Sequence, residues 1–416
     1  MPVEPRTRPF SFPRLAFGVL LYSASGGVLY AILPLFEFEQ PGGGTLLATL
    51  IVGAPLLATV LGTIGWGTLS DRLGRRRELL AAGVLAQSVI FLLYPFLSPV
   101  ELLSVRILQA LLGASSALAT AEATEDPARS AGSGLGGLSF WGSLGSVLGI
   151  VAAFPFLGGA RFTLDSPPAL VLFAMLAAFS AASVYFLVGT GEIQRPRAHT
   201  RLRNALHFSD GKTIVGLSAA TAIIGGSNYV VYTLFPLWVT VVVAPWHPFG
   251  LGLNPTEQVA VLSIGAAMGG VLVSPWTGRV VEGWSGRREL YLLAPLIYSL
   301  LWVAFAFVHI YSVIFIIWAL PVYVILSIPI LREISGRTRP EERGRAVGLW
   351  TASYSLGGLV GTIVAGLAYP AHASFPTLFV LAALGDLLGF FALLRVSRGS
   401  PSSPAPAAPG AVPQEG

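Results

Sequence analysis

Long uninterrupted runs of hydrophobic residues alternate with short polar stretches along nearly the whole chain. A helix needs about 20 apolar residues to cross a hydrocarbon layer of roughly 30 Å, and most of the runs reach that length. Backbone groups inside a membrane must hydrogen-bond within the protein, so continuous runs favour helices over alternating strands. The predicted spans are residues 14–36, 44–69, 79–97, 100–122, 134–157, 168–188, 213–243, 256–277, 289–308, 310–331, 345–369 and 375–395. The pattern therefore predicts an all-α polytopic membrane protein with twelve transmembrane helices.

Polar separators divide these spans into two sets of six. The longest separator, residues 189–212, follows the sixth span and carries four arginines and Lys212. The end of the chain is rich in proline, alanine and serine, a composition typical of disorder. We therefore predict a six-helix bundle over residues 1–190, a cytoplasmic linker over 191–212, a second six-helix bundle over 213–398 and a disordered tail over 399–416.

Composition supports a membrane location. Of the 416 residues, 54% are hydrophobic and 11% are charged, whereas a soluble domain usually carries about 25% charged residues. The absence of cysteine excludes structural disulfides and thiolate metal sites. A net charge of +5 would suit nucleic acid in a soluble protein, but in a membrane protein the positive-inside rule explains it better.

The basic residues are distributed unevenly between alternate loops. All but two of the 25, namely Arg106 and Arg161, fall on the side that both termini and the linker share. Loops rich in arginine and lysine stay in the cytoplasm, so we expect both termini on the cytoplasmic side of the plasma membrane. An error of one span would destroy this asymmetry, so it also supports the count of twelve.

A dense basic stretch, residues 67–77, joins the second and third spans. The glycine at the end of span two allows another helix to approach closely. The single acid, Asp71, can face the positive N-terminal end of a neighbouring helix and accept hydrogen bonds from arginines. A degraded copy of the stretch follows span eight, with Gly278, Glu282 and Arg287 in the corresponding places.

Further echoes relate the two sets of spans. Tyr30 and Pro34 near the end of span one correspond to Tyr232 and Pro236 near the end of span seven, and the glycine-rich spans five and eleven share the sequence Ser-Leu-Gly. Duplicated halves are typical of transporters that rock one half against the other around a central site.

The basic stretch resembles the signature loop of the major facilitator superfamily, which reads roughly Gly-x-x-x-Asp-Arg-x-Gly-Arg-Arg. The matching residues are Gly67, Asp71, Arg72, Gly74, Arg75 and Arg76. With the twelve spans, the linker and the second copy, the resemblance covers residues 14–396. It implies that Asp71 faces span eleven and latches the cytoplasmic side. Such a contact is worth on the order of 1–3 kcal/mol, enough to bias two conformations roughly tenfold.

A simpler role remains open for the arginines of this stretch. Arg76 and Arg77 could set the topology and bind anionic lipid headgroups without taking part in a gate. The first copy of the stretch keeps the aspartate of the motif, Asp71, whereas the degraded copy has a glutamate, Glu282. We therefore expect an asymmetric pair of latches, with the stronger one at residues 67–76.

Span four contains Arg106 and Gln109 one turn apart on the same helix face. They resemble part of a second motif of the family, Arg-x-x-Gln-Gly, with Ala110 where glycine is usual. An arginine within a membrane span is costly and usually faces a cavity or a partner, so we expect it on the transport pathway. The alternative is that its side chain reaches the outer surface near Glu101.

By resemblance, spans one, four, seven and ten line the cavity. The candidates for the substrate or proton pathway are Tyr22, Ser25, Tyr30, Arg106, Gln109, Asn228, Tyr229, Tyr232, Trp318 and Tyr323. Aromatic residues in a membrane span more often pack or lie at the interface, whereas the buried amide of Asn228 needs a partner. Asp386 in span twelve belongs either to a proton route or to a structural hydrogen bond.

These observations favour a secondary active transporter of a small organic solute that works by alternating access. We expect it to be proton-coupled, monomeric and of the efflux or multidrug type, with an amphipathic or anionic substrate. Uptake of sugars or organic anions and a non-transporting membrane sensor are the alternatives. No metal-binding cluster, cofactor motif or nucleophile–base pair is evident, so we expect neither an enzyme nor a cofactor, and lipids as the surrounding partner.

Overall fold

The structure is a computed structural model that describes residues 11–39, 45–125, 128–157, 166–189, 208–243, 252–339, 342–368 and 374–399. At residues 30–39, 45–48, 99 and 284–286 the backbone alone is described. The predicted tail beyond residue 399 and most of the predicted linker, residues 191–207, lie outside the described residues.

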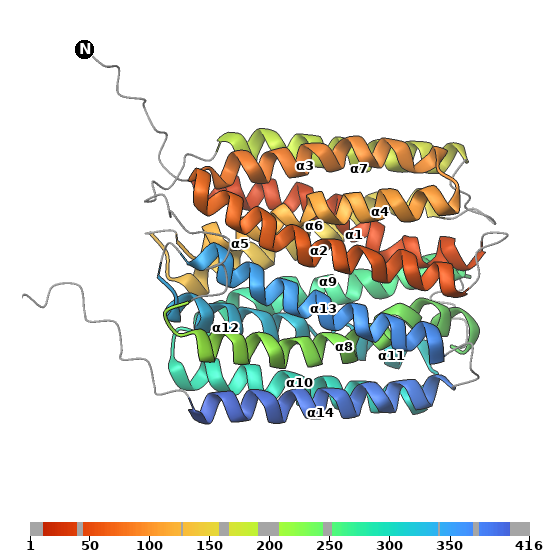
Figure 1. Cartoon of the computed structure of the whole chain (residues 1–416). Helices are drawn as coiled ribbons and strands as arrows, with labels where there is room; N and C mark the ends of the chain where they lie inside the picture. The colour runs from red at the N-terminus through yellow and green to blue at the C-terminus, as the bar shows by residue number, and fades with distance from the viewer. Residues whose placement is uncertain are drawn as a thin grey trace, which may run out of the picture.

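Helices account for nearly all of the described chain (Figure 1). They are α1 (Phe12–Glu39), α2 (Thr45–Leu73), α3 (Arg76–Leu93), η1 (Tyr94–Phe96), α4 (Pro99–Gly113), η2 (Ala114–Ser116), α5 (Ala117–Ala123), α6 (Ala131–Leu157), α7 (Pro167–Gly189), α8 (Gly211–Val241), α9 (Pro255–Val280), α10 (Trp284–Phe307), α11 (Tyr311–Trp318), α12 (Val322–Arg337), α13 (Arg343–Ala368) and α14 (Phe375–Gly399). Twelve segments of the described chain are long and apolar enough to cross a membrane, which confirms the predicted count.

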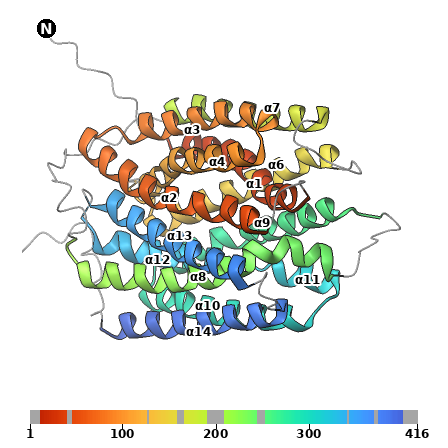
Figure 2. The same cartoon turned by 45° about the vertical axis from the view of Figure 1, so that its right-hand side comes forward.

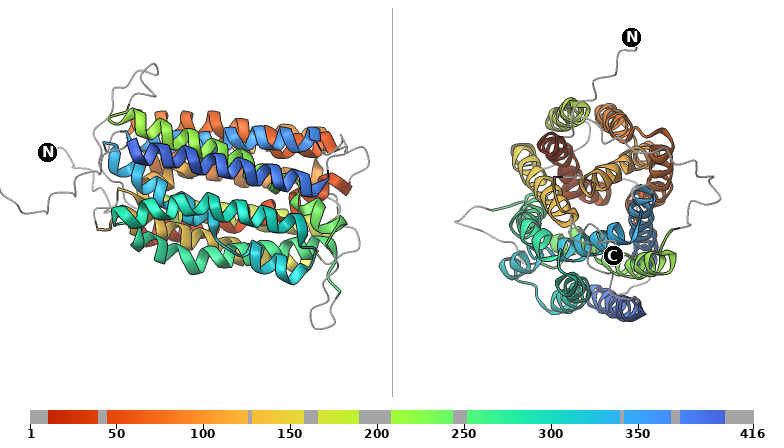
Figure 3. Two further views of the ribbon diagram at one scale, coloured as in Figure 1. Left: turned by 90° about the horizontal axis from the view of Figure 1, so that it is seen from below. Right: turned by 90° about the vertical axis from the view of Figure 1, so that its left-hand side faces the viewer.

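The helices form two groups of six spans. The N-terminal half comprises α1 to α7 and the C-terminal half α8 to α14, and the two groups lie one above the other in the end-on view (Figure 3). Two helix pairs join them, α2 with α13 and α6 with α9, and both pairs make extensive contact. In Figure 2 the same long helices run nearly parallel from one end of the molecule to the other. The fold predicted from the hydrophobic pattern is therefore confirmed.

Glycines bring equivalent helices of each half into close contact. A methyl group on Gly145 of α6 would overlap the backbone of Leu20 on α1, and one on Gly357 of α13 would overlap the backbone of Ala222 on α8. These are the glycines of the repeated Ser-Leu-Gly sequence, so the sequence repeat corresponds to the same packing contact in each half. The glycines of α6 form a packing surface, as expected when backbones approach this closely.

One end of the molecule carries most of the described charged residues, and we call it the arginine-rich end. It contains the loop from Leu73 to Arg76 between α2 and α3, the start of α1 and the end of α14. Gly74 has φ 68° there, a left-handed conformation that glycine adopts without strain. The tight turn between two long helices therefore depends on this glycine.

Two of the spans are broken near their midpoints, a feature that the hydrophobic pattern did not predict. Span four passes through the 3₁₀ turn η2 between α4 and α5. Span ten is interrupted after Trp318, and Pro321 precedes the first residue of α12. Broken helices occur within a membrane where they line a cavity, and both breaks lie at the cavity described next.

Candidate functional site

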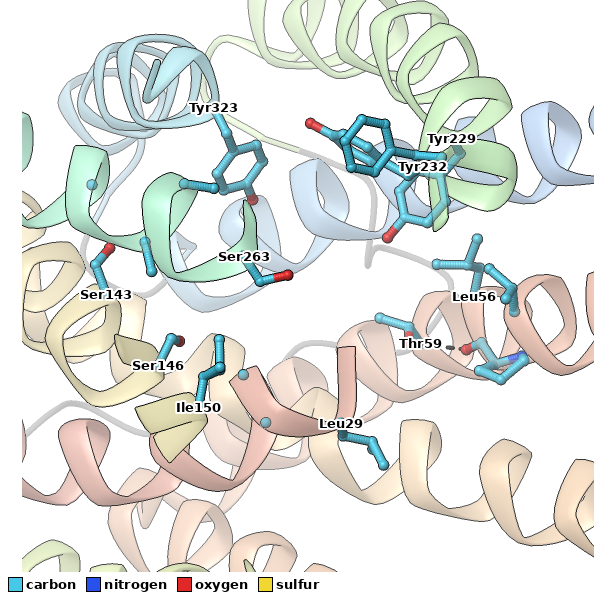
Figure 4. Close-up of a pocket in the computed structure, with 18 of the residues that line it drawn as sticks. Leu29, Leu56, Thr59, Ser143, Ser146, Ile150, Tyr229, Tyr232, Ser263 and Tyr323 are labelled. Atoms are coloured by element: carbon cyan, nitrogen blue, oxygen red, sulfur yellow. Dashed lines mark hydrogen bonds between the residues drawn. The ribbon is translucent and has the colours of Figure 1, made fainter. Parts of the chain in front are cut away.

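A cavity of about 610 Å³ lies between the two halves. Its wall follows α2 from Val52 to Thr63 and α9 from Val259 to Gly270. These stretches cover the middle of each helix and the part away from the arginine-rich end. Figure 4 shows that Ser143 and Ser146 of α6 point into the space from one side, while Tyr232 and Tyr323 approach from the other.

The N-terminal half contributes the guanidinium and amide side chains of the wall. Arg106 on α4 donates a hydrogen bond from Nη1 to Oε1 of Gln109 at 2.7 Å. The same oxygen accepts a hydrogen bond from the hydroxyl of Tyr94, and Gln87 on α3 donates to the backbone carbonyl of Gln109 at 3.2 Å. This network fixes the orientation of Arg106 at the cavity wall.

The wall contributed by the C-terminal half is aromatic. The rings of Phe235 on α8 and Trp318 on α11 are stacked with centroids 3.7 Å apart. Tyr232 meets the rings of Trp302 and Trp318 edge-on, at centroid distances of 6.0 Å and 5.6 Å. Tyr298 adds a further ring, because it stacks on Trp302. Such pairs form a rigid surface that suits a flat apolar group.

The cavity contains one charged side chain among the described residues that line it, and that residue is Arg106. The described residues that line the cavity include no aspartate or glutamate. Hydroxyl and amide groups make up the rest of the polar lining. The chemistry of the wall therefore favours an anionic group at α4 and an apolar or aromatic group opposite.

Most of the predicted pathway residues lie where the sequence places them. Those that line the cavity are Tyr22, Arg106, Gln109, Tyr229, Tyr232, Trp318 and Tyr323. Ser25 does not line it and donates to the backbone of Tyr22. The side chain of Tyr30 lies outside the described ones.

Asn228 is placed differently from the prediction. It is fully buried away from the cavity and its amide nitrogen lies 3.5 Å from the hydroxyl of Tyr354 on α13. The expected partner of the buried amide therefore exists, but it belongs to the interface between α8 and α13 and not to the cavity wall.

Several cavity residues were missed because their spans were not expected to line it. They are Gln87, Ser143, Ser146, Ser263, Tyr298 and Trp302. Tyr298 and Trp302 are four residues apart and therefore share a helix face, which was a usable signal for the aromatic wall.

Asp71 lies at the arginine-rich end against the start of α13. A methyl group on Gly344, the second residue of α13, would lie 2.8 Å from Oδ1 of Asp71, and one on Gly67 would lie 3.3 Å from the carbonyl oxygen of Gly344. Oδ2 of Asp71 is 3.7 Å from Nε of Arg345 on the same helix. Asp71 therefore faces span eleven, as the resemblance implied.

Arg76 and Arg77 are buried and paired, so their role is not limited to setting topology or binding headgroups. Arg76 is 1% exposed and donates to Asp71 at 2.9 Å and to Glu125 at 2.7 Å. Nε of Arg77 is 3.7 Å from Glu122. Arg75, by contrast, is exposed and pairs with Glu78 on the surface.

Glu282 occupies the equivalent position in the C-terminal half. Its Oε1 accepts a hydrogen bond at 2.7 Å from the backbone nitrogen of Gly132, the second residue of α6. Its Oε2 is 3.3 Å from Nη2 of Arg332. Gly278 contacts the backbone of Gly132 and Gly136, which lets α9 and α6 approach closely. The degraded copy therefore still joins the two halves.

A second ion network surrounds Arg287, the arginine of that copy named above. Arg287 is 3.2 Å from Glu333, which also accepts from Arg337, and Arg337 donates to Asp210 at 2.7 Å. Asp210 caps α8 by accepting from the backbone of Thr213. Partial burial alone would raise the pKa of Asp210, but the hydrogen bonds from Arg337 and Thr213 outweigh it and hold that pKa below its ordinary value.

Asp386 lies behind the aromatic wall. It is fully buried on α14, and its Oδ2 accepts a hydrogen bond from the indole nitrogen of Trp302 at 2.8 Å.

Among the described residues no group of three or more histidines and acids could hold a metal ion.

Known proteins resemble this chain in sequence, and the family that they indicate has the fold described above. A family model described as Major Facilitator Superfamily matches residues 15–332 and 217–414. A curated relative, the staphyloferrin B transporter of Staphylococcus aureus (strain NCTC 8325 / PS 47), is 32% identical over 153 residues. The aligned stretch covers 35% of this chain and 35% of that relative.

Solved structures share the fold at low sequence identity. The human organic anion transporter MFSD10 (TETRAN) superposes with a TM-score of 0.68 at 17% identity and covers 94% of this chain and 100% of its own. The transporter FucP in the outward conformation gives a TM-score of 0.68 at 15% identity, with 94% and 99% covered. The nucleoside transporter NupG gives 0.68 at 13% identity, with 92% and 99% covered. The chain belongs to the Major Facilitator Superfamily and is a transporter of small solutes.

Proposed function

We propose that this protein is a secondary active transporter of small amphipathic organic anions. The observation that carries the proposal is the division of the cavity wall between Arg106 on one side and stacked aromatic rings on the other. Arginine binds carboxylates through paired hydrogen bonds, and the rings offer a surface for a flat apolar group. A cation would be repelled by Arg106, and the described residues of the wall include no carboxylate that could bind it.

The name of one similar protein is in line with an anionic solute. That superposed structure is described as an organic anion transporter, while the curated relative is described as a staphyloferrin B transporter. Both likenesses are distant or partial, so the proposed class of solute rests on the cavity wall itself.

The mechanism we propose is alternating access, with residues 1–190 and 213–398 rocking about the cavity. Asp71 and Glu282 are the latches in this proposal, since each contacts the start of a helix in the opposite half. The arginine-rich end faces the cytoplasm, in agreement with the positive-inside rule. The protein works as a monomer in the plasma membrane.

Proton-coupled efflux is the direction we propose. A cavity with a broad aromatic wall accommodates amphipathic molecules of differing shape, as an exporter of such compounds requires. The same site can also exchange one anion for another across the membrane. This exchange can be measured as counterflow, which needs no pH gradient.

The proposal is tested in proteoliposomes with three isosteric solutes. Benzoate carries a ring and a carboxylate, benzamide is its neutral analogue and benzamidine its cationic analogue. We expect counterflow of benzoate to exceed that of the other two, and an imposed pH gradient to drive net benzoate movement. Equal rates for all three, or no benzoate movement above that of empty liposomes, would contradict the proposed solute class.

A further inference from the structure

A carboxyl group lies buried in the membrane region behind the cavity and is not used by the mechanism proposed above. Asp386 on α14 is fully buried and does not belong to the cavity wall. One of its oxygens accepts the indole hydrogen of Trp302, and Oδ1 has no hydrogen bond to any residue that the structure describes.

No cation compensates this carboxyl group in the described part of the chain. The ion pairs there do not include Asp386. The titratable groups that face it are the phenols of Tyr232 on α8 and Tyr298 on α10. An ionised carboxylate with one hydrogen bond and no counter-ion is costly to keep away from water. Uptake of a proton removes that cost, because it makes the carboxyl group neutral.

Among the described residues, the one hydrogen bond to the side chain of Asp386 comes from a residue of the cavity wall. Trp302 lines the cavity and stacks on Tyr298, with ring centroids 5.4 Å apart and planes at 18°. The hydroxyl of Tyr298 lies 3.3 Å from that of Tyr232, which meets Trp302 edge-on. A change in the position of the indole therefore has to be accommodated by two other rings of the aromatic wall.

We propose that Asp386 is a proton-binding site and that its occupancy positions Trp302 in the cavity wall. The inference rests on the proposed transport function and names the group through which protons act on it. The step is a simple proton transfer: the carboxylate takes up a proton from water to become a carboxylic acid, and releases it on return. An ionised acceptor binds the indole N–H more strongly than a neutral one, so protonation loosens Trp302 and deprotonation fixes it.

Asp386 is thus a positioning residue, because it acts on the solute through Trp302. Its charge is separated from Arg106 by the cavity, so the proton site and the proposed anion site lie on opposite halves. In this proposal the aromatic wall couples proton binding on α14 to anion binding at α4. A purely structural hydrogen bond that holds α14 against α10 would give no such coupling.

Infrared difference spectroscopy on the purified full chain tests the proton site without any solute. We expect a carbonyl band of a protonated carboxylic acid that appears and disappears reversibly with pH and is absent in Asp386→Asn. In Trp302→Phe, which keeps the carboxyl group and removes the indole donor, the midpoint of that band should move to higher pH. Trp276→Phe, at an exposed tryptophan of α9 that does not line the cavity, serves as the matched control and should leave the midpoint unchanged. Absence of a pH-dependent band from Asp386 throughout the pH range of the folded protein would overturn the proposal.

Benzoate transport tests the coupling. In Asp386→Asn, counterflow should continue near the wild-type rate, while movement driven by a pH gradient should fall by roughly tenfold or more, a range typical of coupling between two sites. Equal loss of both activities would indicate a structural role and overturn the inference. If the wild type shows the infrared band but moves no benzoate, the solute class is wrong and the proton site stands. If Asp386→Asn does not fold, the expected shift of the infrared midpoint in Trp302→Phe still tests the proton site, and an unshifted midpoint would overturn the inference.

Discussion

Asp71 and Glu282 lie in equivalent positions at the arginine-rich end, and each faces the first turn of a helix in the opposite half. Asp71 contacts Gly344, the second residue of α13, and Glu282 accepts a hydrogen bond from Gly132, the second residue of α6. The N-terminus of a helix carries a partial positive charge, so both acids stabilise the contact between the halves. In the proposed mechanism the two contacts close the same side of the cavity.

Neutralising Asp71 should shift the protein toward conformations in which the arginine-rich end is open. Asp71→Asn keeps the size of the side chain but removes the charge that pairs with Arg76 and Arg345. A buried charge-assisted contact is worth on the order of 1–3 kcal/mol, so we expect the open population to rise roughly tenfold. The chain has no cysteine, so spin labels at Glu78→Cys and Arg398→Cys report the distance between the halves.

The matched variant Glu282→Gln should have a smaller effect. The side chain of Asp71 is 3% exposed and that of Glu282 is 32% exposed, and solvent weakens the more exposed contact. The double variant, which combines Asp71→Asn with Glu282→Gln, should have the largest population that is open at the arginine-rich end. Identical distance distributions in the wild type and all three variants would show that neither acid acts as a latch.

Adding a single methyl group to α13 should destabilise the C-terminal half. A methyl group at Gly357 would overlap the carbonyl oxygen of Ala222 on α8, and overpacking of this kind usually costs about 1–3 kcal/mol. Gly357→Ala should therefore lower the thermal unfolding temperature. Gly65→Ala is the control, because no atom lies within 4 Å of its added methyl group. An equal effect of both substitutions would contradict the close packing of α8 and α13.

Stability should depend on pH through Asp210. Its folded-state pKa lies below its ordinary value of 3.8, so its contribution is present above that value and is lost as the pH falls through the folded pKa. Asp210→Asn keeps a good helix cap and removes the charge that pairs with Arg337. The variant should unfold at lower temperature than the wild type at pH 7, and the gap should shrink in acid below the ordinary value. A gap that is the same at both pH values would exclude the ion pair as its cause.

The fold follows from the sequence because span length and loop charge are imposed by the membrane. The two mid-span breaks could not be predicted from the sequence. The residues around η2 and around Pro321 are as apolar or as small as the residues of an unbroken span. The contact of Asp71 with span eleven came from the family resemblance. Its buried partner Arg345 and the pairing of Arg76 with Glu125 were not foreseen, because pairs between segments far apart in the sequence leave no local pattern.

The cavity wall was predicted only in part for a similar reason. Spans that are apolar on every side do not indicate which face is turned to the cavity, and Asn228 was placed on the wrong face. Arg106 was identified because a charge within a span has few places where it is stable. The aromatic wall of α10 was missed because that span was not among the four that the resemblance assigned to the cavity.

The central claim is that Arg106 holds the anionic group of the solute. Loss of a hydrogen-bonded ion contact of about 1.5–3 kcal/mol corresponds to roughly a ten- to hundredfold change in affinity. The control is Arg75→Gln, which removes the same charge from an exposed position at the arginine-rich end.

Calorimetric binding of benzoate and benzamide to the purified protein is the most direct measurement. We predict that the wild type and Arg75→Gln bind benzoate more tightly than benzamide, and that Arg106→Gln loses this preference. Benzoate binding in Arg106→Gln that equals the wild type, or no preference for benzoate in the wild type, would contradict the account.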